Sequence, residues 1–430
     1  MNIIRYTDSA YADELRRLDR RAEASDAVRG VVASVIQEIR QRGDAALIEL
    51  TAKFDGASLT PKSLRVSDAE IEAAGQSVEP HVQEALEAAQ RNVSVFAHHS
   101  LRKDWKMFNE QGAEVGEVFH PFERVGIYVP GGTAPLVSTS IMTVTIAAAA
   151  GVPEIVVCTP CGKDGMVNPN LLAALKLAGA TEIYRVGGSQ AIAALAFGTE
   201  TIKPVVKIFG PGNSYVVEAK RQVFGVVSID LLPGPSEVMV LADSTANPAF
   251  VAADLLAQAE HGKDSGVAFI TDDESLLNAV LEEIQMQGTT LSRQQMIRSV
   301  LEKECVLILV PNLEEGAQIV NQYAPEHLSL ITAREHDILP LIRTAGAIFL
   351  GNYSPVAVGD FLAGPSHTLP TGGAGKSFPG LTADMFQRRT SIVRLDKASV
   401  TASDPIVRIF SEIEGLDAHG ASASVRVGRK

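Results

Sequence analysis

The feature that most constrains the fold is an alternation of short β-rich runs with glycine-bearing turns and helical patterns, which begins near residue 125. A first block has four such runs, at residues 125–129, 154–158, 182–185 and 206–209. A second block has five, at residues 238–241, 267–271, 306–310, 328–331 and 347–350. Strands that alternate with helices are typical of a parallel sheet covered by helices. The sequence therefore predicts an α/β fold with two doubly wound parallel-sheet domains.

The segments outside these blocks have other patterns. Residues 1–100 show mainly helical periodicity, and residues 106–108 and 114–119 predict a hairpin. Residues 351–380 hold seven glycines and four prolines with little periodicity, which is typical of a long ordered loop with a binding or catalytic role.

The tail beyond residue 381 predicts a strand at residues 391–395 and two helices, around residues 405–412 and 418–425. So short a segment cannot bury a core of its own. We therefore expect it to dock on a partner.

Composition limits the kind of partner. The 430 residues include 51 acidic and 38 basic side chains, a net charge of −13, which disfavours nucleic acid or an anionic membrane surface. The most apolar stretch, residues 141–152, is shorter than the roughly 20 residues that a membrane helix needs. The N-terminus lacks the apolar core of a signal peptide, and only three cysteines occur. These observations predict a cytoplasmic protein that acts on small molecules.

Glu326 and His327 stand side by side just after Pro325. A carboxylate and an imidazole together can transfer protons at neutral pH. This pair is the strongest local indication of catalysis in the chain.

Other side chains could bind a metal. Gln258 and His261 are three residues apart near the end of a predicted helix, so both lie on one helix face. An amide oxygen and an imidazole so placed can supply two ligands, but the same pattern fits a solvated helix end. Asp360 fits either a hard metal ligand or a turn, and His367 fits either a substrate contact or a hydrogen bond to nearby backbone.

Three glycine-bearing turns follow strands of the first block, at residues 130–135, 187–190 and 210–213. Ligands of open α/β sheets bind at the carboxyl ends of strands, and helices that start there present free N–H groups to a pyrophosphate. None of the turns is a G-x-G-x-x-G fingerprint, since Tyr215 stands where the last glycine belongs. A nucleotide site and ordinary strand-to-helix connections are equally compatible with them.

Taken together, these motifs resemble the histidinol dehydrogenase family over nearly the whole chain. The matching segments are Arg124–Gly132, Gly187–Ala196, Gly210–Asn213, Glu218–Val223, Gly234–Val238, Gln258–His261, Tyr323–Leu328, Gly359–Asp360, Leu369–Gly373 and Gly415–His419. The resemblance implies two incomplete Rossmann-like domains with small terminal domains. It also implies a homodimer.

The implied boundaries are a helical N-terminal arm at residues 1–24 and a first Rossmann-like domain of residues 25–125 plus 236–380, which carries the metal and acid/base residues. Residues 126–235 would form the second, NAD-binding domain. Residues 381–430 would be a tail exchanged between subunits.

The resemblance also assigns roles to single residues. It implies one Zn²⁺ per subunit held by Gln258, His261, Asp360 and the other subunit's His419. Glu326 and His327 would be the acid/base pair. The implied substrate-binding residues are Ser236, Gln258, His261, His327, Asp360, His367, Glu414 and His419, and the implied NAD-binding residues are Tyr128, Gln190 and Asn213.

The expected reaction is the oxidation of L-histidinol to L-histidine through L-histidinaldehyde with two NAD, the last two steps of histidine biosynthesis. The alternative is a related zinc and NAD dehydrogenase acting on another small alcohol, such as a sulfonated diol. Glu414 argues against that alternative, because a carboxylate suits a substrate ammonium group and repels a sulfonate.

Overall fold

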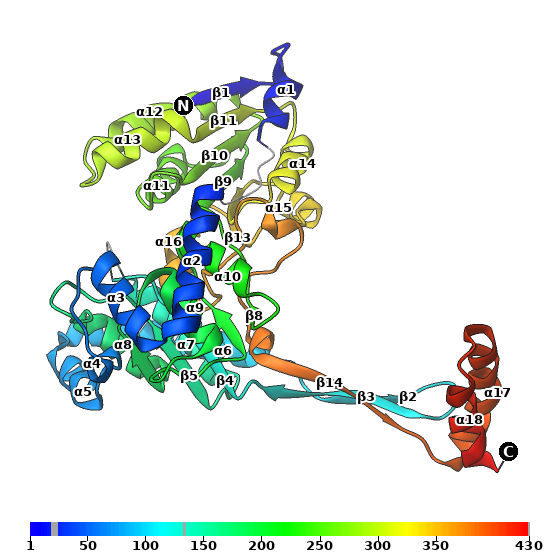
Figure 1. The fold of residues 1–430 in the computed structure, drawn as a ribbon. Coiled ribbons are helices and arrows are strands. Elements are labelled where there is room, and N and C mark those ends of the chain that lie inside the picture. Colours follow the sequence, from blue (N-terminus) through cyan, green and yellow to red (C-terminus); the bar gives the residue numbers. More distant parts are fainter. Residues whose placement is uncertain (19–24, 132–134, 429–430) are drawn as a thin grey trace. The chain divides into compact units, whose positions relative to one another are not determined.

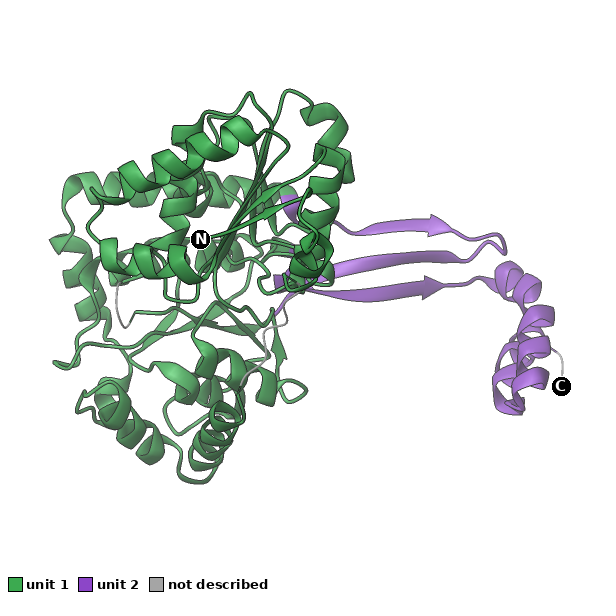
Figure 2. Cartoon of the chain, turned by 90° about the horizontal axis from the view of Figure 1, so that it is seen from above, with its two compact units in different colours: residues 1–99, 123–383 green, residues 100–122, 384–430 purple. Residues whose placement is uncertain are grey.

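The computed structural model describes residues 1–18, 25–131 and 135–428. They form two compact units, one of residues 1–99 and 123–383 and one of residues 100–122 and 384–430 (Figure 2). Residues 132–134 of the first predicted glycine turn, and residues 19–24 of the predicted N-terminal arm, lie outside the described part of the chain. Within the described ranges, no helix has the length and apolarity that a membrane crossing requires.

The first unit contains a six-stranded parallel sheet (Figure 1). Its strands, in spatial order, are β1 (Asn2–Arg5), β11 (Cys305–Leu309), β10 (Gly266–Thr271), β9 (Glu237–Ala242), β12 (His327–Ile331) and β13 (Ala347–Leu350). Alternate residues of β9 belong to different cores: Val238 and Val240 to one, Met239 and Leu241 to the other. Both faces of the sheet are therefore buried, as parallel strands require.

Helices supply the residues that cover these two faces. The core of Val238 contains residues of α11 (Pro248–Ala259), α12 (Glu274–Gly288) and α13 (Gln294–Lys303). The core of Met239 contains residues of α14 (Leu313–Tyr323) and α15 (Glu335–Ile338), with α1 (Tyr11–Arg16) against it.

The same unit holds a five-stranded parallel sheet. Its spatial order is β6 (Glu182–Tyr184), β5 (Glu154–Cys158), β4 (Arg124–Tyr128), β7 (Lys207–Phe209) and β8 (Ser228–Ile229). The helices between these strands are α7 (Val137–Ala149), α8 (Pro169–Ala178), α9 (Gly188–Phe197) and α10 (Ser214–Val223). The two parallel sheets confirm the predicted α/β class, and all nine predicted strands of the two blocks are present to within two residues at each end.

The N-terminal helices pack on the five-stranded sheet. Val32, Ile36 and Leu47, from α2 (Asp26–Arg42) and α3 (Asp44–Phe54), share a core with residues of α9 and α10. The remaining helices of this region are α4 (Pro61–Leu64), α5 (Asp68–Ser77) and α6 (Pro80–Ser100), and α5 packs on α8. In this unit α2 and α3 thus pack on helices from residues 126–235. The predicted domain boundaries stay a prediction.

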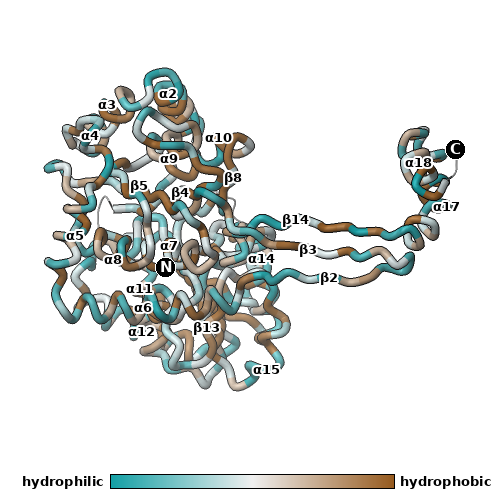
Figure 3. Tube along the Cα trace, turned by 90° about the horizontal axis from the view of Figure 1, so that it is seen from below, coloured by the Kyte–Doolittle hydropathy of each residue, from teal (hydrophilic) through white to brown (hydrophobic). Residues whose placement is uncertain are grey.

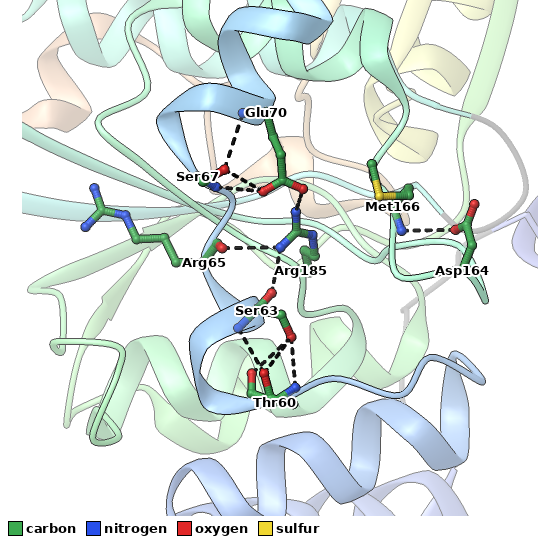
Figure 4. A network of polar contacts seen from close by, with 8 residues as sticks. All are labelled: Thr60, Ser63, Arg65, Ser67, Glu70, Asp164, Met166 and Arg185. Carbon is green, nitrogen blue, oxygen red and sulfur yellow. Dashed lines mark hydrogen bonds and ion pairs between the residues drawn. The ribbon is translucent and has the colours of Figure 1, made fainter.

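Arg185 ties this N-terminal region to the edge of the five-stranded sheet (Figure 4). Its guanidinium donates to the carbonyl oxygen of Ser63 at 2.6 Å and to that of Arg65 at 3.2 Å, and it pairs with the carboxylate of Glu70. Ser67 caps α5 and also donates to Glu70 at 2.8 Å. The segment that follows α3 is thereby fixed to β6.

The second unit is a three-stranded antiparallel sheet followed by two helices. Its spatial order is β14 (Gln387–Arg394), β3 (Glu114–Pro121) and β2 (Trp105–Phe108), and the helices are α17 (Lys397–Glu414) and α18 (Asp417–Ser424). The predicted hairpin is confirmed as β2 and β3. Figure 3 shows hydrophobic stretches along β3 and β14.

Two expectations about local structure were wrong. Residues 2–5 are a strand at the edge of the six-stranded sheet rather than part of a helical arm, because they pair with β11. Asp360 lies in a short helix, α16 (Val356–Phe361), and not in an irregular loop. Short 3-10 helices complete the fold, at Leu339–Leu341, Ala374–Lys376, Ala383–Phe386 and Val425–Val427.

Candidate active site

A cavity of about 930 Å³ in the first unit brings together six of the residues singled out in the sequence. They are Tyr128, Gln190, Asn213, Ser236, Glu326 and His367. Tyr128 ends β4, Gln190 lies in the first turn of α9 and Asn213 caps α10, and Ser236 and Glu326 precede strands of the six-stranded sheet. The cavity is therefore lined from both sheets.

The described residues of the three glycine turns lie at the carboxyl ends of β4, β6 and β7, as predicted, and each turn contributes residues to the cavity lining. β4 and β7 are neighbours in the sheet but not in the chain, so the site lies where the strand order reverses. Gly210, directly after β7, has φ +106°, and a Cβ there would collide with the carbonyl oxygen of Tyr128. Only glycine lets the two turns approach this closely.

A buried ion pair holds the Gly210 turn in place. Lys220 Nζ donates to the Gly210 carbonyl oxygen at 2.9 Å and pairs with the Asp230 carboxylate. Asp230 Oδ2 in turn accepts the Gly210 N–H at 2.7 Å. Both side chains are fully buried, so the ion pair is shielded from water and holds the Gly210 turn rigidly.

The polar side chains on this wall are positioned by backbone groups. Tyr128 Oη accepts the Gly188 N–H at 3.1 Å, and burial raises the pKa of Tyr128 to about 12. Asn213 Oδ1 caps α10 by accepting two backbone N–H bonds at 3.1 Å, which leaves its amide N–H groups for a ligand. Gln190 is buried, and its Nε2 has no hydrogen-bond partner among the described residues.

Glu326 and His327 are both held by Glu237, the first residue of β9. Glu326 Oε2 accepts the Glu237 N–H at 2.9 Å, and His327 Nδ1 lies 3.1 Å from the Glu237 carbonyl oxygen. Helix α14 ends at Tyr323, the φ of 55° at Ala324 turns the chain before Pro325, and β12 then starts at His327. The Ala-Pro pair thus places both side chains at the amino end of β12.

Burial and mutual charge set the protonation of this pair. Burial raises the pKa of Glu326 to about 7, although the positive charge of His327 opposes the shift. Burial acts to lower the pKa of His327, but the carboxylates of Glu326 and Asp360 outweigh it and raise that pKa to about 9. A carboxyl group whose pKa lies near neutrality is suited to general acid/base work.

Asp360 connects this pair to two further histidines. Its Oδ1 lies 3.3 Å from His327 Nε2, in an orientation that forms no aligned hydrogen bond. Its carbonyl oxygen lies 3.0 Å from His367 Nδ1, and His367 Nε2 lies 3.2 Å from Thr139 Oγ1. Burial acts to raise the pKa of Asp360, but His327, His367 and His261 lower it below its usual value.

Gln258 lies in the last turn of α11, which ends two residues before its predicted end at His261, so His261 lies just beyond the helix. Gln258 is buried, and its Nε2 has no partner in the part of the chain that the structure describes. His261 is exposed, and its Nδ1 lies 3.1 Å from the Ala257 carbonyl oxygen, which leaves Nε2 as the free nitrogen. The described residues include no group of three or more His, Cys, Asp or Glu side chains placed to hold a metal.

Comparison with known proteins decides the family. A sequence profile of the histidinol dehydrogenase family matches residues 18–427. The chain is 44% identical to histidinol dehydrogenase of Heliobacterium mobile over 92% of this chain and 93% of that protein. It is 42% identical to the Rhizobium meliloti enzyme over 99% and 98%. The chain belongs to the histidinol dehydrogenase family.

The fold agrees with this assignment. The crystal structure of histidinol dehydrogenase from Elizabethkingia anophelis matches with a TM-score of 0.95 at 38% identity, covering 100% of this chain and 98% of that one. The histidinol dehydrogenase family comprises NAD-dependent oxidoreductases, so Glu326, His327 and the glycine turns lie in an enzyme of that class.

Two residues predicted for the site of a histidinol dehydrogenase lie in the second unit. Glu414 is the last residue of α17 and His419 lies in α18, and both are exposed. Their roles at the active site stay predictions.

Several residues that shape the site were missed in the sequence. Glu237 holds both members of the acid/base pair, and Thr139 contacts His367. Asp55 lines the cavity from the end of α3. Glu237 could have been suspected from its place beside Ser236, but nothing in the local sequence distinguishes Thr139 or Asp55.

Proposed function

We propose that this chain oxidises L-histidinol to L-histidine through L-histidinaldehyde, with two molecules of NAD bound in turn at the glycine turns. One observation carries the proposal: a single cavity is lined by the turns of the five-stranded sheet and by Glu326 and His367 from the other side. The order of the five-stranded sheet, which reads 3-2-1-4-5 in chain order, supports a Rossmann-like interpretation of the NAD-binding part. Strands β9 to β13 have the same order.

His327 is suited to remove the hydroxyl proton. Its Nδ1 faces the Glu237 carbonyl oxygen, so in the neutral imidazole Nδ1 carries the proton and Nε2 is the nitrogen that accepts one. Because the pKa of His327 is raised to about 9, the fraction in this neutral form increases as the pH rises toward that value. The Asp360 carboxylate, 3.3 Å from Nε2, stabilises the imidazolium that forms.

Glu326 is suited to the second oxidation. Its carboxylate lines the cavity, and the Glu237 N–H fixes one of its oxygens. With a pKa of about 7, a useful fraction is ionised at neutral pH and can take a proton from the water that hydrates the aldehyde. His327 would again serve as the base for the second hydride transfer.

The residues present fit a zinc ion. One amide oxygen, two imidazole nitrogens and one carboxylate form a donor set that zinc accepts. His261 donates Nδ1–H to a carbonyl oxygen, the usual outer contact of a zinc-bound histidine. We infer that Gln258, His261 and Asp360 would hold the ion together with the partner subunit's His419. Bound zinc would position the imidazole and amino nitrogens of the substrate.

A homodimer is supported by the surface of the second unit. Apolar side chains exposed there include Trp105, Phe108, Val393, Ile409, Phe410 and Ile413. On α17 the last three recur at helical spacing and form one stripe. A unit this small leaves such a surface uncovered in a single chain, and a second copy would cover it. Cytoplasmic location stays a prediction.

The proposed function is tested by NADH formation with L-histidinol and, separately, with sulfopropanediol. Turnover of L-histidinol, with two NADH formed per molecule, is the expected result. Turnover of the sulfonated diol alone would instead identify a related dehydrogenase, and Ser236 and Glu414 would then need different roles.

A further inference from the structure

Asp55 has a buried carboxylate oxygen without a partner. It follows α3 directly and lines the cavity together with Lys53 and Phe54. Its Oδ2 has almost no solvent-accessible surface and no described group donates a hydrogen bond to it, while the side chain as a whole is half-buried and faces the cavity. Burial raises the pKa of Asp55. A buried carboxylate oxygen with no donor is costly, and its presence in a cavity indicates that a ligand supplies the donor.

The surroundings of this oxygen are those of the glycine turns. A Cβ built on Gly187 would lie 3.4 Å from Asp55 Oδ2. The next residue, Gly188, donates its N–H to Tyr128 Oη, so the phenolic proton of Tyr128 is left for a ligand. The charge of Asp55 also contributes to raising the pKa of Tyr128. One wall of the cavity thus presents an acceptor, Asp55, near a donor, Tyr128.

This wall is rigid and separate from the acid/base pair. Helix α3 packs against α9, and its first residue, Asp44, bonds to Thr201 through its carboxylate and to Glu200 through its N–H at 2.7 Å. Glu326, by contrast, precedes β12 of the six-stranded sheet. A ligand that spans the cavity can therefore meet Asp55 with one end and Glu326 with the other.

We propose that Asp55 accepts hydrogen bonds from ribose hydroxyls of the dinucleotide and makes the enzyme specific for NAD over NADP. The proposal rests on the function proposed above. A vicinal diol offers two O–H donors to one carboxylate, the solution that dinucleotide-binding sheets use elsewhere. The 2′-phosphate of NADP would bring a dianion against this carboxylate, and a like-charge contact of that kind costs several kcal/mol. Lys53 Nζ lies 5.4 Å from the centroid of the Phe54 ring, in a cation–π contact.

The test compares Asp55→Asn and Asp55→Ala with wild type for both dinucleotides. Calorimetry of NAD and NADP binding without substrate gives affinities, and steady-state assays with L-histidinol give KM and kcat. We expect both variants to bind NAD about tenfold or more weakly, the loss of about 1.4 kcal/mol or more. The ratio of NADP to NAD affinity should rise at least tenfold, with kcat at saturating NAD changed much less. Asp68→Asn, which removes an exposed carboxylate from α5, should match wild type.

Unchanged NAD affinity and an unchanged NADP to NAD ratio in folded Asp55→Asn would overturn the proposal, as would equal use of NADP by wild type. Thermal unfolding of each variant establishes that it is folded, and Asp55→Asn preserves shape if the alanine variant does not fold. If wild type fails to oxidise L-histidinol, the proposed function is wrong. The binding measurements then still decide the role of Asp55, because they need no substrate.

Discussion

The Nε2 atom of His327 lies 3.3 Å from Oδ1 of Asp360, which joins the first residue of β12 to the last turn of α16. The proposed base and a proposed zinc ligand are therefore direct neighbours. Any change of charge at Asp360 alters the electrostatic field at His327. The two residues should therefore be tested by different measurements: proton transfer for His327 and metal content for Asp360.

Glu326→Gln should impair the second oxidation more than the first. The amide keeps an oxygen that can accept the Glu237 N–H, so the local fold is preserved, but it cannot take a proton from water. A positioned proton acceptor typically contributes about 10² to 10⁴ in rate. NADH formation from L-histidinaldehyde should fall by that range, while NADH formation from L-histidinol in a single turnover should fall far less. Equal losses of rate in both half-reactions would refute the proposal that Glu326 acts mainly in the second oxidation.

His261→Ala should abolish stoichiometric zinc binding. The substitution removes a proposed ligand whose orientation is set by the Ala257 carbonyl oxygen, and the three remaining proposed ligands would hold zinc much more weakly. Elemental analysis after dialysis should show well below one zinc per chain, against about one in wild type. His336→Ala, on the short helix α15, is the matched control and should retain zinc. Full zinc in the His261 variant would show that the metal site lies elsewhere.

Sequence patterns predicted the strands well but did not predict which sheet the N-terminal helices cover. Strands β5 and β12 are continuous apolar runs bounded by turns, so their existence is a local property. Which sheet α2 and α3 cover depends on the fit of their apolar faces to α9 and α10, a contact between segments more than 100 residues apart along the sequence. No periodicity within residues 26–54 encodes that choice.

The residues of the candidate site also fall into two groups, those that the sequence indicates and those that it does not. Glu326 and His327 were visible because they are adjacent, and Gln258 and His261 because of their helical spacing. Glu237 acts mainly through its backbone N–H and carbonyl groups, which carry no sequence signal. Asp55 becomes notable only through the burial of its carboxylate, which depends on the turn at Gly187.

Gly210→Ala should weaken NAD binding, while Gly225→Ala should not. Both glycines have φ above +100°, so both substitutions carry a similar backbone strain. A methyl group at Gly210 would also collide with the Tyr128 backbone and separate the two turns, whereas nothing lies within 4 Å of the position at Gly225. Calorimetry should show NAD affinity reduced about tenfold or more for Gly210→Ala. Similar NAD affinities for the two folded variants would exclude the close approach of the turns as a requirement for binding.

A mixture of His419→Ala and Glu326→Ala subunits should regain activity. If each site uses His419 of the partner subunit, a mixed dimer has one site with both defects and one with neither. Each variant alone should be nearly inactive, and after denaturation and joint refolding the mixture should recover about a quarter of wild-type activity, since half of the dimers are mixed and each has one intact site. Differently tagged subunits allow mixed dimers to be isolated and counted. Verified mixed dimers without activity would show that His419 serves its own chain.

Asp254→Asn should change how stability depends on pH. Asp254 lies on α11 and bonds to Ser329 Oγ at 3.4 Å and to the Val356 N–H, and burial raises its pKa to about 6. Because the folded chain then holds this proton more tightly than the unfolded chain, stability is lost as pH rises from about 4 to about 6 and stays lost above that. Because asparagine carries no charge, Asp254→Asn should not lose stability over this pH range. Its side chain keeps one acceptor oxygen. Relative to wild type, metal-free Asp254→Asn should therefore gain about 1–2 kcal/mol in urea unfolding between pH 4 and pH 8. The matched surface variant Asp26→Asn should show no such pH-dependent gain, and a constant difference at every pH would show that hydrogen bonding of Asp254, rather than its charge, controls stability.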